Sequence, residues 1–168
     1  MSRSAEVNFV HQQGFRSFSD SECGTRYSAL MFQPRLIGIL VAVGTVTQTW
    51  LLFLVLGLIA WWNALAPLMN PFDAIYNGLV AGPKGLPSIA PAPGPRRFAQ
   101  GMAGTFMLSI AISLLMKWWG LAWILEGLLV AALAALIFGK FCLGSYVFHL
   151  FRGEAAFANR TLPWARRA

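Results

Sequence analysis

Apolar residues lie along this chain in long runs, which short polar or glycine-containing stretches interrupt. The first two runs, residues 36–43 and 50–66, flank the stretch GTVTQT. A single helix over residues 34–66 would be about 50 Å long and would place three threonines and a glutamine near the middle of an apolar layer about 30 Å thick. We therefore predict a helical hairpin over 34–66 that turns at GTVTQT, with helices of about 15 residues that are short for a full span. The alternative is a first helix that begins near Tyr27 and kinks at Pro34.

The next two apolar runs predict a second helical hairpin over residues 97–141. Its first helix starts at RRFAQ and runs to Lys117. Trp118, Trp119 and Trp123 crowd an expected turn at Gly120, as in the aromatic belt of a membrane face. The last helix is expected to run from about residue 121 to at least residue 141, and an extension through FHLF to Arg152 stays open.

A linker with seven prolines, residues 67–96, joins the hairpins. Within it, Asn70 is a suitable cap, and apolar residues recur at helical spacing over 71–81, which predicts a short helix lying in the membrane surface. Residues 1–33 form a polar amino-terminal segment in which Ser19 and Glu22 have capping-box spacing, so a short helix is expected there too. Residues 142–168 form a carboxy-terminal segment.

Composition places this all-α architecture in a bilayer. The chain is 57% hydrophobic and 11% charged, has seven tryptophans and a mean hydropathy of +0.60, whereas a soluble domain is about 25% charged. The net charge of +7 does not indicate nucleic acid here, because the basic residues flank the apolar runs. We expect a lipid bilayer as the main partner, with anionic lipid at the basic face.

The basic residues also predict the topology. With four transmembrane helices, both termini and the linker share one side, and Lys117 alone lies on the other. Twelve basic residues against one favour a cytoplasmic location for both termini, in a bacterial inner membrane. The residues of the basic side are Arg3, Arg16, Arg26, Arg35, Lys84, Arg96, Arg97, Lys140, Arg152, Arg160, Arg166 and Arg167.

Small residues recur every fourth position on both helices of the second hairpin. Such ridges let two backbones approach closely, which predicts close packing of these two helices on each other; a docking face for another protein is the alternative. The two ridges are Gly101, Thr105, Ser109, Ser113 and Gly127, Ala131, Ala135, Gly139.

Two short motifs carry a family resemblance. RRFAQ is followed some forty residues later by GKFCLGS. In this the chain resembles a bacterial family of small four-helix membrane proteins catalogued only as a domain of unknown function, over about residues 26–150. The resemblance implies two apolar hairpins, a proline-rich linker ending in a basic-Phe-Ala-Gln motif and a closing Phe-Cys-x-Gly-Cys. Here Ser145 stands at the position of the second cysteine, and no established activity accompanies the family.

Cys142 is the first candidate for chemistry. A Cys-x-x-Cys pair can cycle between dithiol and disulfide, but Cys142 with Ser145 has a thiol that can attack and no partner to resolve the product. Cys23 is the one further cysteine. The alternative is a small residue at a helix contact, since free cysteine is usually a buried small hydrophobe.

Glu126 and His149 are the remaining candidates. Glu126 is the one acidic residue inside an apolar span, where it could carry a proton, pair with Lys117 or accept a hydrogen bond from the GTVTQT turn. His149 could ligate haem iron or chlorophyll magnesium, or lie at the interface among Phe148, Phe151 and Arg152. No catalytic triad, phosphate loop or metal cluster is visible in the sequence.

These observations favour a non-enzymatic small membrane protein. We expect an accessory or structural subunit of a larger membrane complex, with a respiratory or photosynthetic assembly as one plausible host and other membrane subunits as partners. A thiol-redox protein that uses Cys142 and a small transporter that uses Glu126 are the alternatives. The sequence names no cofactor.

Overall fold

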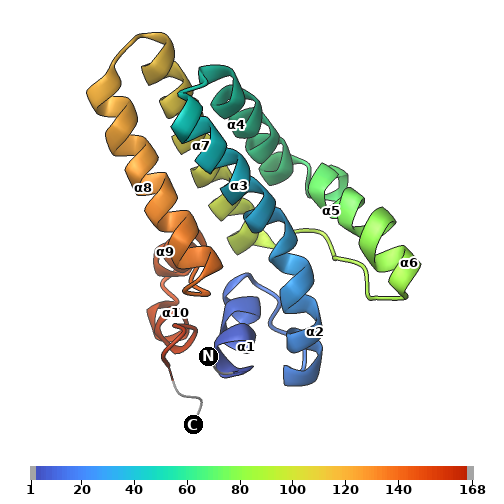
Figure 1. The fold of residues 1–168 in the computed structure, drawn as a ribbon. Coiled ribbons are helices and arrows are strands. Elements are labelled where there is room, and N and C mark those ends of the chain that lie inside the picture. Colours follow the sequence, from blue (N-terminus) through green and yellow to red (C-terminus); the bar gives the residue numbers. More distant parts are fainter. Residues whose placement is uncertain (1–2, 166–168) are drawn as a thin grey trace.

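The computed structural model describes residues 3–165, which are helical with connecting turns and contain no strand (Figure 1). The predicted all-α fold is thereby confirmed. Short helices open and close the chain, and four longer ones lie side by side between them. In chain order the main helices are α1 Arg3–Gln12, α2 Asp20–Leu30, α3 Phe32–Thr47, α4 Trp50–Leu65, α7 Gly94–Leu115, α8 Trp119–Ile137, α9 Leu143–Phe151 and α10 Ala155–Arg160.

The first hairpin turns inside GTVTQT, as the polar residues predicted. Helix α3 ends at Thr47, Gln48 takes a left-handed conformation with φ of 51°, and α4 begins at Trp50. The helix before this turn starts earlier than the predicted position 34. Helix α3 begins at Phe32, two residues before Pro34, and only Met31 separates it from α2. The capping box at the start of α2 is formed, with the Ser19 N–H donating to Glu22 Oε2 at 2.8 Å.

The second hairpin departs from the sequence prediction at two points. Its turn lies at Lys117, which has φ of 59°, so Gly120 falls inside α8. Helix α8 ends at Ile137 and does not continue to residue 141 or to Arg152. Lys140 is left-handed with φ of 55°, and the Phe141 N–H donates to the Ala135 carbonyl at 3.1 Å, which closes the helix end and redirects the chain into α9.

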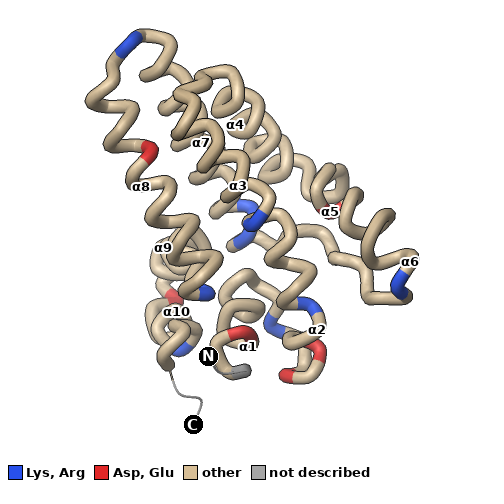
Figure 2. The backbone as a smooth tube through the Cα atoms, viewed as in Figure 1, with Lys and Arg blue, Asp and Glu red and all other residues tan. Residues whose placement is uncertain are grey.

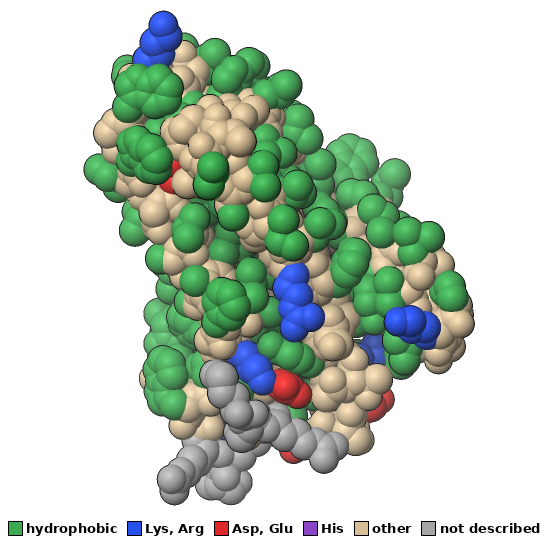
Figure 3. All heavy atoms as spheres, viewed as in Figure 1, with side chains coloured by type: hydrophobic (Ala, Val, Ile, Leu, Met, Phe, Trp, Pro, Cys, Tyr) green, Lys and Arg blue, Asp and Glu red, His purple; other side chains and the backbone are tan. Residues whose placement is uncertain are grey.

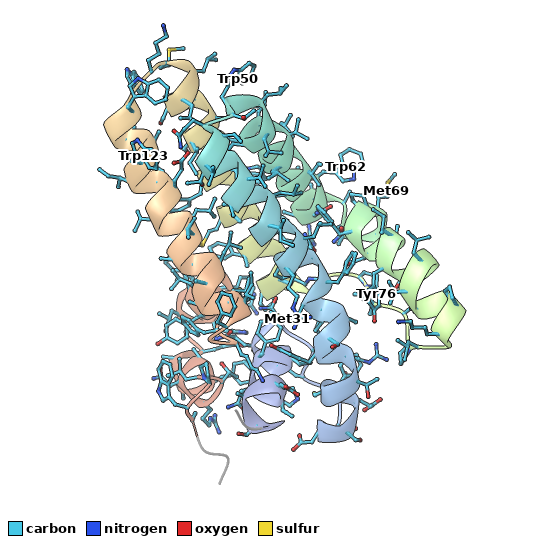
Figure 4. All side chains as sticks on the ribbon, in the orientation of Figure 1. Met31, Trp50, Trp62, Met69, Tyr76 and Trp123 are labelled. Carbon is cyan, nitrogen blue, oxygen red and sulfur yellow. The ribbon has the colours of Figure 1, made fainter. Side chains whose placement is uncertain are left out.

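The linker is partly helical, as predicted for residues 71–81. Asn70 accepts hydrogen bonds from the N–H groups of Phe72 and Asp73 and so caps α5, Pro71–Tyr76. A π-helical turn, Asn77–Ala81, and the short α6, Gly82–Lys84, continue it, and a single 3-10 turn, Pro67–Met69, precedes it. Trp62 donates from Nε1 to the Met69 carbonyl at 3.2 Å and ties this turn to α4 (Figure 4). The placement of α5 at a membrane surface stays a prediction.

A close backbone contact joins the two hairpins. A Cβ atom at Gly57 of α4 would lie 3.1 Å from the Gly104 carbonyl oxygen of α7, and one at Gly104 would lie 3.1 Å from that of Gly57. Gly101 likewise faces Ala64 and Trp61 of α4. Close backbone approach therefore occurs between α4 and α7 and not, as predicted, between α7 and α8.

The two small-residue ridges do not face each other. No atom lies within 4 Å of a Cβ built at Gly127, and Ala131 is exposed, so this half of the α8 ridge points outward. On α7, Thr105 and Ser113 donate to carbonyls of their own helix, Gly101 and Ser109, at 3.0 and 2.8 Å. The four-residue spacing was identified correctly, but spacing alone does not say which neighbour a ridge meets.

Three stretches of the described chain are long and apolar enough to cross a membrane: Asp20–Thr47, Gly94–Leu115 and Trp119–Ile137. Helix α4 is apolar but has only 16 residues. By length and composition this is a multi-pass membrane protein. Of the apolar window in α8, only 17% is buried, against 44% in α7, so α8 presents most of its surface outward.

Charge is separated along the bundle. Lys117 lies at the turn between α7 and α8. The other visible basic segments lie between the middle of the bundle and the end where both termini lie (Figure 2). The space-filling view shows apolar side chains over most of the visible face of the bundle, with charged side chains at the top, near the middle and toward the end where the termini lie (Figure 3). Arg166, Arg167 and the side chain of Arg3 lie outside the described part of the chain.

Candidate functional site: a cavity with a polar end

A cavity of about 260 Å³ lies between α3, α7 and α8 and reaches the amino-terminal segment. Most of its wall is apolar, with Ile37 from α3, Met107 from α7 and Leu129 from α8 among the buried side chains that line it. Leu128, Leu129, Ala132, Leu133 and Leu136 form the α8 side of this wall.

The polar side chains of the cavity wall gather from three segments. Gln13 comes from the amino-terminal segment, Gln33 from the first turn of α3, and Arg96 and Gln100 from the start of α7. Arg96 and Gln100 are four residues apart and so share one face of α7. The cavity therefore has an apolar body and a polar end.

A buried ion pair anchors this polar end. Arg96 Nη2 lies 2.9 Å from Asp73 Oδ1 of α5, and both residues are nearly inaccessible, at 5% and 7% exposed. Gln33 Oε1 accepts three hydrogen bonds, from Arg96 at 3.0 Å, Gln100 at 3.1 Å and Asn70 at 3.3 Å. The network joins α3, α5 and α7, and its one guanidinium is matched by one carboxylate.

Three buried atoms on the side chains that line the cavity have no hydrogen-bond partner: Gln13 Nε2, Arg96 Nη1 and Gln100 Oε1. More than nine in ten buried polar groups in folded proteins are satisfied. Leaving one unpaired costs about 1–3 kcal/mol. Each of the three atoms is enclosed by its protein neighbours and has almost no accessible surface.

Sequence reasoning did not single out these residues as a site. Arg96 was counted only for topology, and Asp73 was interpreted only as a favourable charge at a helix start. The available signal was the motif RRFAQ, which places Arg96 and Gln100 on one helix face. Gln33 and Asp73 reach Arg96 only through the packing of α3 and α5 on α7. No local sequence pattern encodes that packing.

Cys142 also lines the cavity, at the point where the chain enters α9. Its N–H donates to Gln12 Oε1 at 2.9 Å, and it belongs to the same buried apolar cluster as Cys23. No disulfide joins the two cysteines. Ser145, buried one turn further, donates to the Pro95 carbonyl at 3.3 Å, so its hydroxyl has a structural partner.

Glu126 lies apart from the residues that line the cavity. It is fully buried on α8, and Gln48 Nε2 donates to its two carboxylate oxygens at 3.0 and 3.3 Å. The hydrogen bond expected from the GTVTQT turn is thus confirmed. None of the ion pairs in the described residues joins Glu126 to Lys117.

His149 is fully buried. Its Nε2 lies 3.1 Å from the Gln12 carbonyl oxygen and its Nδ1 lies 2.8 Å from Glu154 Oε2, so both ring nitrogens already have partners within the protein. Arg16 also pairs with Glu154. The hydrogen bond from Arg16, followed by that from His149, lowers the pKa of the Glu154 carboxyl.

The described residues contain no group of three or more His, Cys, Asp and Glu side chains that could hold a metal ion. The site consists of the cavity, a polar end in which Arg96 and Asp73 balance each other's charge, and the Cys142 thiol.

The two motifs that carry the family resemblance touch each other beside this cavity. A Cβ atom at Gly144 of the Phe-Cys-x-Gly motif would lie 2.7 Å from Ala99 of the Arg-Phe-Ala-Gln motif. Comparison with curated proteins and with solved structures found no match. A family model does match, over residues 28–152, close to the extent that the motifs predicted. The chain therefore belongs to the family described as domain of unknown function DUF4395.

Proposed function

We propose that this chain is a non-enzymatic membrane protein that binds a lipid-derived molecule in the cavity between α3, α7 and α8. The cavity is the observation that carries the proposal. Its wall is mostly apolar, so an apolar chain that moves into it from the bilayer stays in an apolar environment and pays no cost for exposure to water. Leu128 lines the cavity and is also 55% exposed, which gives a bilayer molecule a route of entry along α8.

The test is a comparison of two adjacent alanines on α8. Ala132 lines the cavity, whereas Ala131 is exposed. We expect Ala132→Trp to fill the cavity, and Ala131→Trp to leave it open. The protein is purified in mild detergent, and co-purifying lipids are extracted and quantified by mass spectrometry. A bound lipid that Ala132→Trp loses and Ala131→Trp keeps supports the proposal. Equal recovery from both variants contradicts it.

The membrane arrangement belongs to the same proposal. Helix α4 acts as the fourth transmembrane helix, and both termini and the linker face the cytoplasm, with the helix over 71–81 at the bilayer surface. The separation of Lys117 from the other basic residues supports this orientation. Reporter fusions at residues 2 and 165 and in the turn at Lys117 test it in a bacterial inner membrane. A reporter at Lys117 that behaves like the terminal ones contradicts it.

A second candidate is a role as an accessory subunit of a larger membrane assembly. It rests on the outward-facing small residues of α8, where Gly127 has no neighbour and Ala131 is exposed. We expect Gly127→Leu to reduce the recovery of partner subunits in a gentle purification. Gly120 also has open space around it, so Gly120→Leu is the control and should leave the recovery of partner subunits unchanged. Elution as a lone monomer from native membranes would rule out this role.

A further inference from the structure

We infer that a groove between α4 and α7 holds one anionic phospholipid, with its phosphate on Arg97 and an acyl chain along α7. This groove is a different space from the cavity between α3, α7 and α8, and the inference does not rest on ligand binding in that cavity. Three observations carry it: the shape of the groove, the unmatched charge of Arg97 and the way its guanidinium is held.

The groove has a volume of about 460 Å³ and lies on the outer side of the bundle. Its wall is mostly apolar, with Trp61 and Leu65 from α4 and Phe98 and Phe106 from α7. Leu65 is 70% exposed and Thr105 of the same wall is exposed, so the groove opens outward, where the bilayer surrounds a membrane protein. Its occupant is therefore in contact with lipid.

The groove runs from the end of α4 toward the middle of the bundle. Arg97 and Thr105 both line it and are eight residues apart, which is about 12 Å along α7. Trp62, in the last turn of α4, is 50% exposed and points outward, as tryptophans at a membrane face do (Figure 4). Arg97 thus lies at the level of lipid head groups, and the apolar wall continues in the direction of the acyl chains.

Arg97 has no carboxylate partner. Its neighbour Arg96 is paired with Asp73, whereas none of the ion pairs in the described residues includes Arg97, and the groove wall has no acidic side chain. A cationic side chain at the edge of an apolar layer is costly unless it is paired or hydrated. A phosphate that carries net negative charge supplies the missing countercharge.

The guanidinium is held in place for such a contact. Arg97 Nε donates to the Ala64 carbonyl oxygen of α4 at 2.7 Å, which fixes the side chain across the groove end without neutralising its charge. Its two terminal nitrogens have no hydrogen-bond partner in the described part of the chain and keep accessible surface. Arginine nitrogens suit the oxygens of a phosphate, and a side chain already ordered loses less freedom on binding.

Two lipids with the same acyl chains test the head group. The full chain is purified in mild detergent, dioleoyl phosphatidylglycerol or dioleoyl phosphatidylcholine is added, and native mass spectrometry counts the bound lipids. We expect the first phosphatidylglycerol to bind at least about fivefold more tightly than phosphatidylcholine, the effect of one cationic side chain near a membrane surface. Equal affinity for the two lipids overturns the inference.

Arg97→Gln tests the charge, and Lys84→Gln is its matched control. Lys84 is the exposed basic residue at the end of α6 and does not line the groove (Figure 2). We expect Arg97→Gln to weaken phosphatidylglycerol binding about fivefold and to leave phosphatidylcholine binding unchanged, and Lys84→Gln to change neither. An equal loss in both variants would mean attraction by the overall positive charge and would overturn the assigned site.

Thr105→Trp tests the groove without touching Arg97. The Thr105 hydroxyl bonds only to the Gly101 carbonyl of its own helix, so its loss leaves the helix contacts intact. Ile112→Trp is the control, because Ile112 is exposed two turns further along α7 and does not line the groove. We expect Thr105→Trp to abolish tight phosphatidylglycerol binding and Ile112→Trp to retain it. Retention in both variants overturns the inference.

Two further outcomes identify a different occupant. Ala132 lines the cavity and not the groove, so Ala132→Trp should retain the bound phosphatidylglycerol. Loss in Ala132→Trp with retention in Thr105→Trp would place the anionic lipid in the cavity and overturn the inference while leaving the proposed function standing. A dimer mass that Thr105→Trp removes would assign the groove to a second copy of the chain, which also overturns it.

Discussion

Gly144 at the start of α9 lies directly against Ala99 of α7, where a Cβ atom at position 144 would approach the Ala99 Cα and Cβ atoms to 2.7 Å. The contact is to backbone as well as side chain, so the neighbour cannot simply rotate away. We expect Gly144→Ala to lower the free energy of unfolding by about 1–3 kcal/mol, the usual cost of overpacking. Denaturant titration in detergent, followed by tryptophan fluorescence, measures it.

Two further variants make this test specific. Gly127→Ala adds the same methyl group where no atom lies within 4 Å, and we expect it to be neutral or slightly stabilising. Ala99→Gly combined with Gly144→Ala should recover part of the loss. A Gly144→Ala protein as stable as the unmodified one would show that α7 and α9 do not meet at this point.

The Gln48–Glu126 pair predicts an asymmetry between single and double variants. Gln48→Leu leaves the buried Glu126 carboxyl without its donor, at an expected cost of about 1–3 kcal/mol in unfolding free energy. Gln48→Leu with Glu126→Leu should be less destabilising than Gln48→Leu alone, because neither polar group is then left unpaired. A double variant that is less stable than Gln48→Leu would disprove the structural role. Loss of a measured ion or proton flux in Glu126→Gln would instead favour a transporter.

Glu154 predicts how stability depends on pH. Its pKa is lowered by hydrogen bonds from Arg16 and, to a smaller extent, from His149. A carboxyl whose pKa is lower in the folded than in the unfolded chain stabilises the fold above the unfolded value of about 4.3, and this contribution disappears as the pH falls through the folded pKa. The melting temperature of the unmodified protein should therefore exceed that of Glu154→Gln at pH 7, and the difference should shrink below about pH 4. A difference that grows with acidity would contradict this assignment.

Cys142 predicts a selective pattern of thiol labelling. It lines the cavity, whereas Cys23 is fully buried in the apolar cluster behind it. In a Cys23→Ser protein we expect a small apolar maleimide to label Cys142 much faster than a charged thiosulfonate of similar size, since the cavity wall is mostly apolar. Mass spectrometry of the intact protein follows the reaction. Equal labelling rates with both reagents would place the Cys142 thiol in water. Loss of the protein's cellular activity in a Cys142→Ala variant would instead favour a thiol-redox function.

Much of the architecture was predictable because membrane solvation constrains local sequence. Polar residues in the middle of an apolar run identify the turn at Gln48, and the spacing of Ser19 and Glu22 identifies a helix start. The turn of the second hairpin and the end of α8 were misplaced because residues other than glycine adopt left-handed backbone there. Lys117 lies in the turn between α7 and α8, and Lys140 lies just after the end of α8. Lys140 is held by an ion pair with Glu6 at 2.8 Å, a contact across the whole chain.

The candidate site was predictable only in part. Cys142 was identified from its motif, but the cavity beside it depends on how α3, α7 and α8 are placed in space, which a local motif does not encode. Periodicity identified glycines suited to close packing without identifying their partner. The pairing of Arg96 with Asp73 depends on the same unseen packing, and so does the position of His149 against the Gln12 carbonyl.

The docking of α1 has a consequence for the order in which the protein can fold. Asn8 donates to the carbonyl oxygens of Leu162 and Ala165 at 3.0 and 3.2 Å, and Gln12 receives the N–H of Cys142. These partners leave the ribosome only after all four long helices have been made. Helix α1 can pack early against α2, where the Phe9 and Tyr27 rings meet, but its hydrogen bonds to Leu162, Ala165 and Cys142 can form only after the fourth long helix has been made.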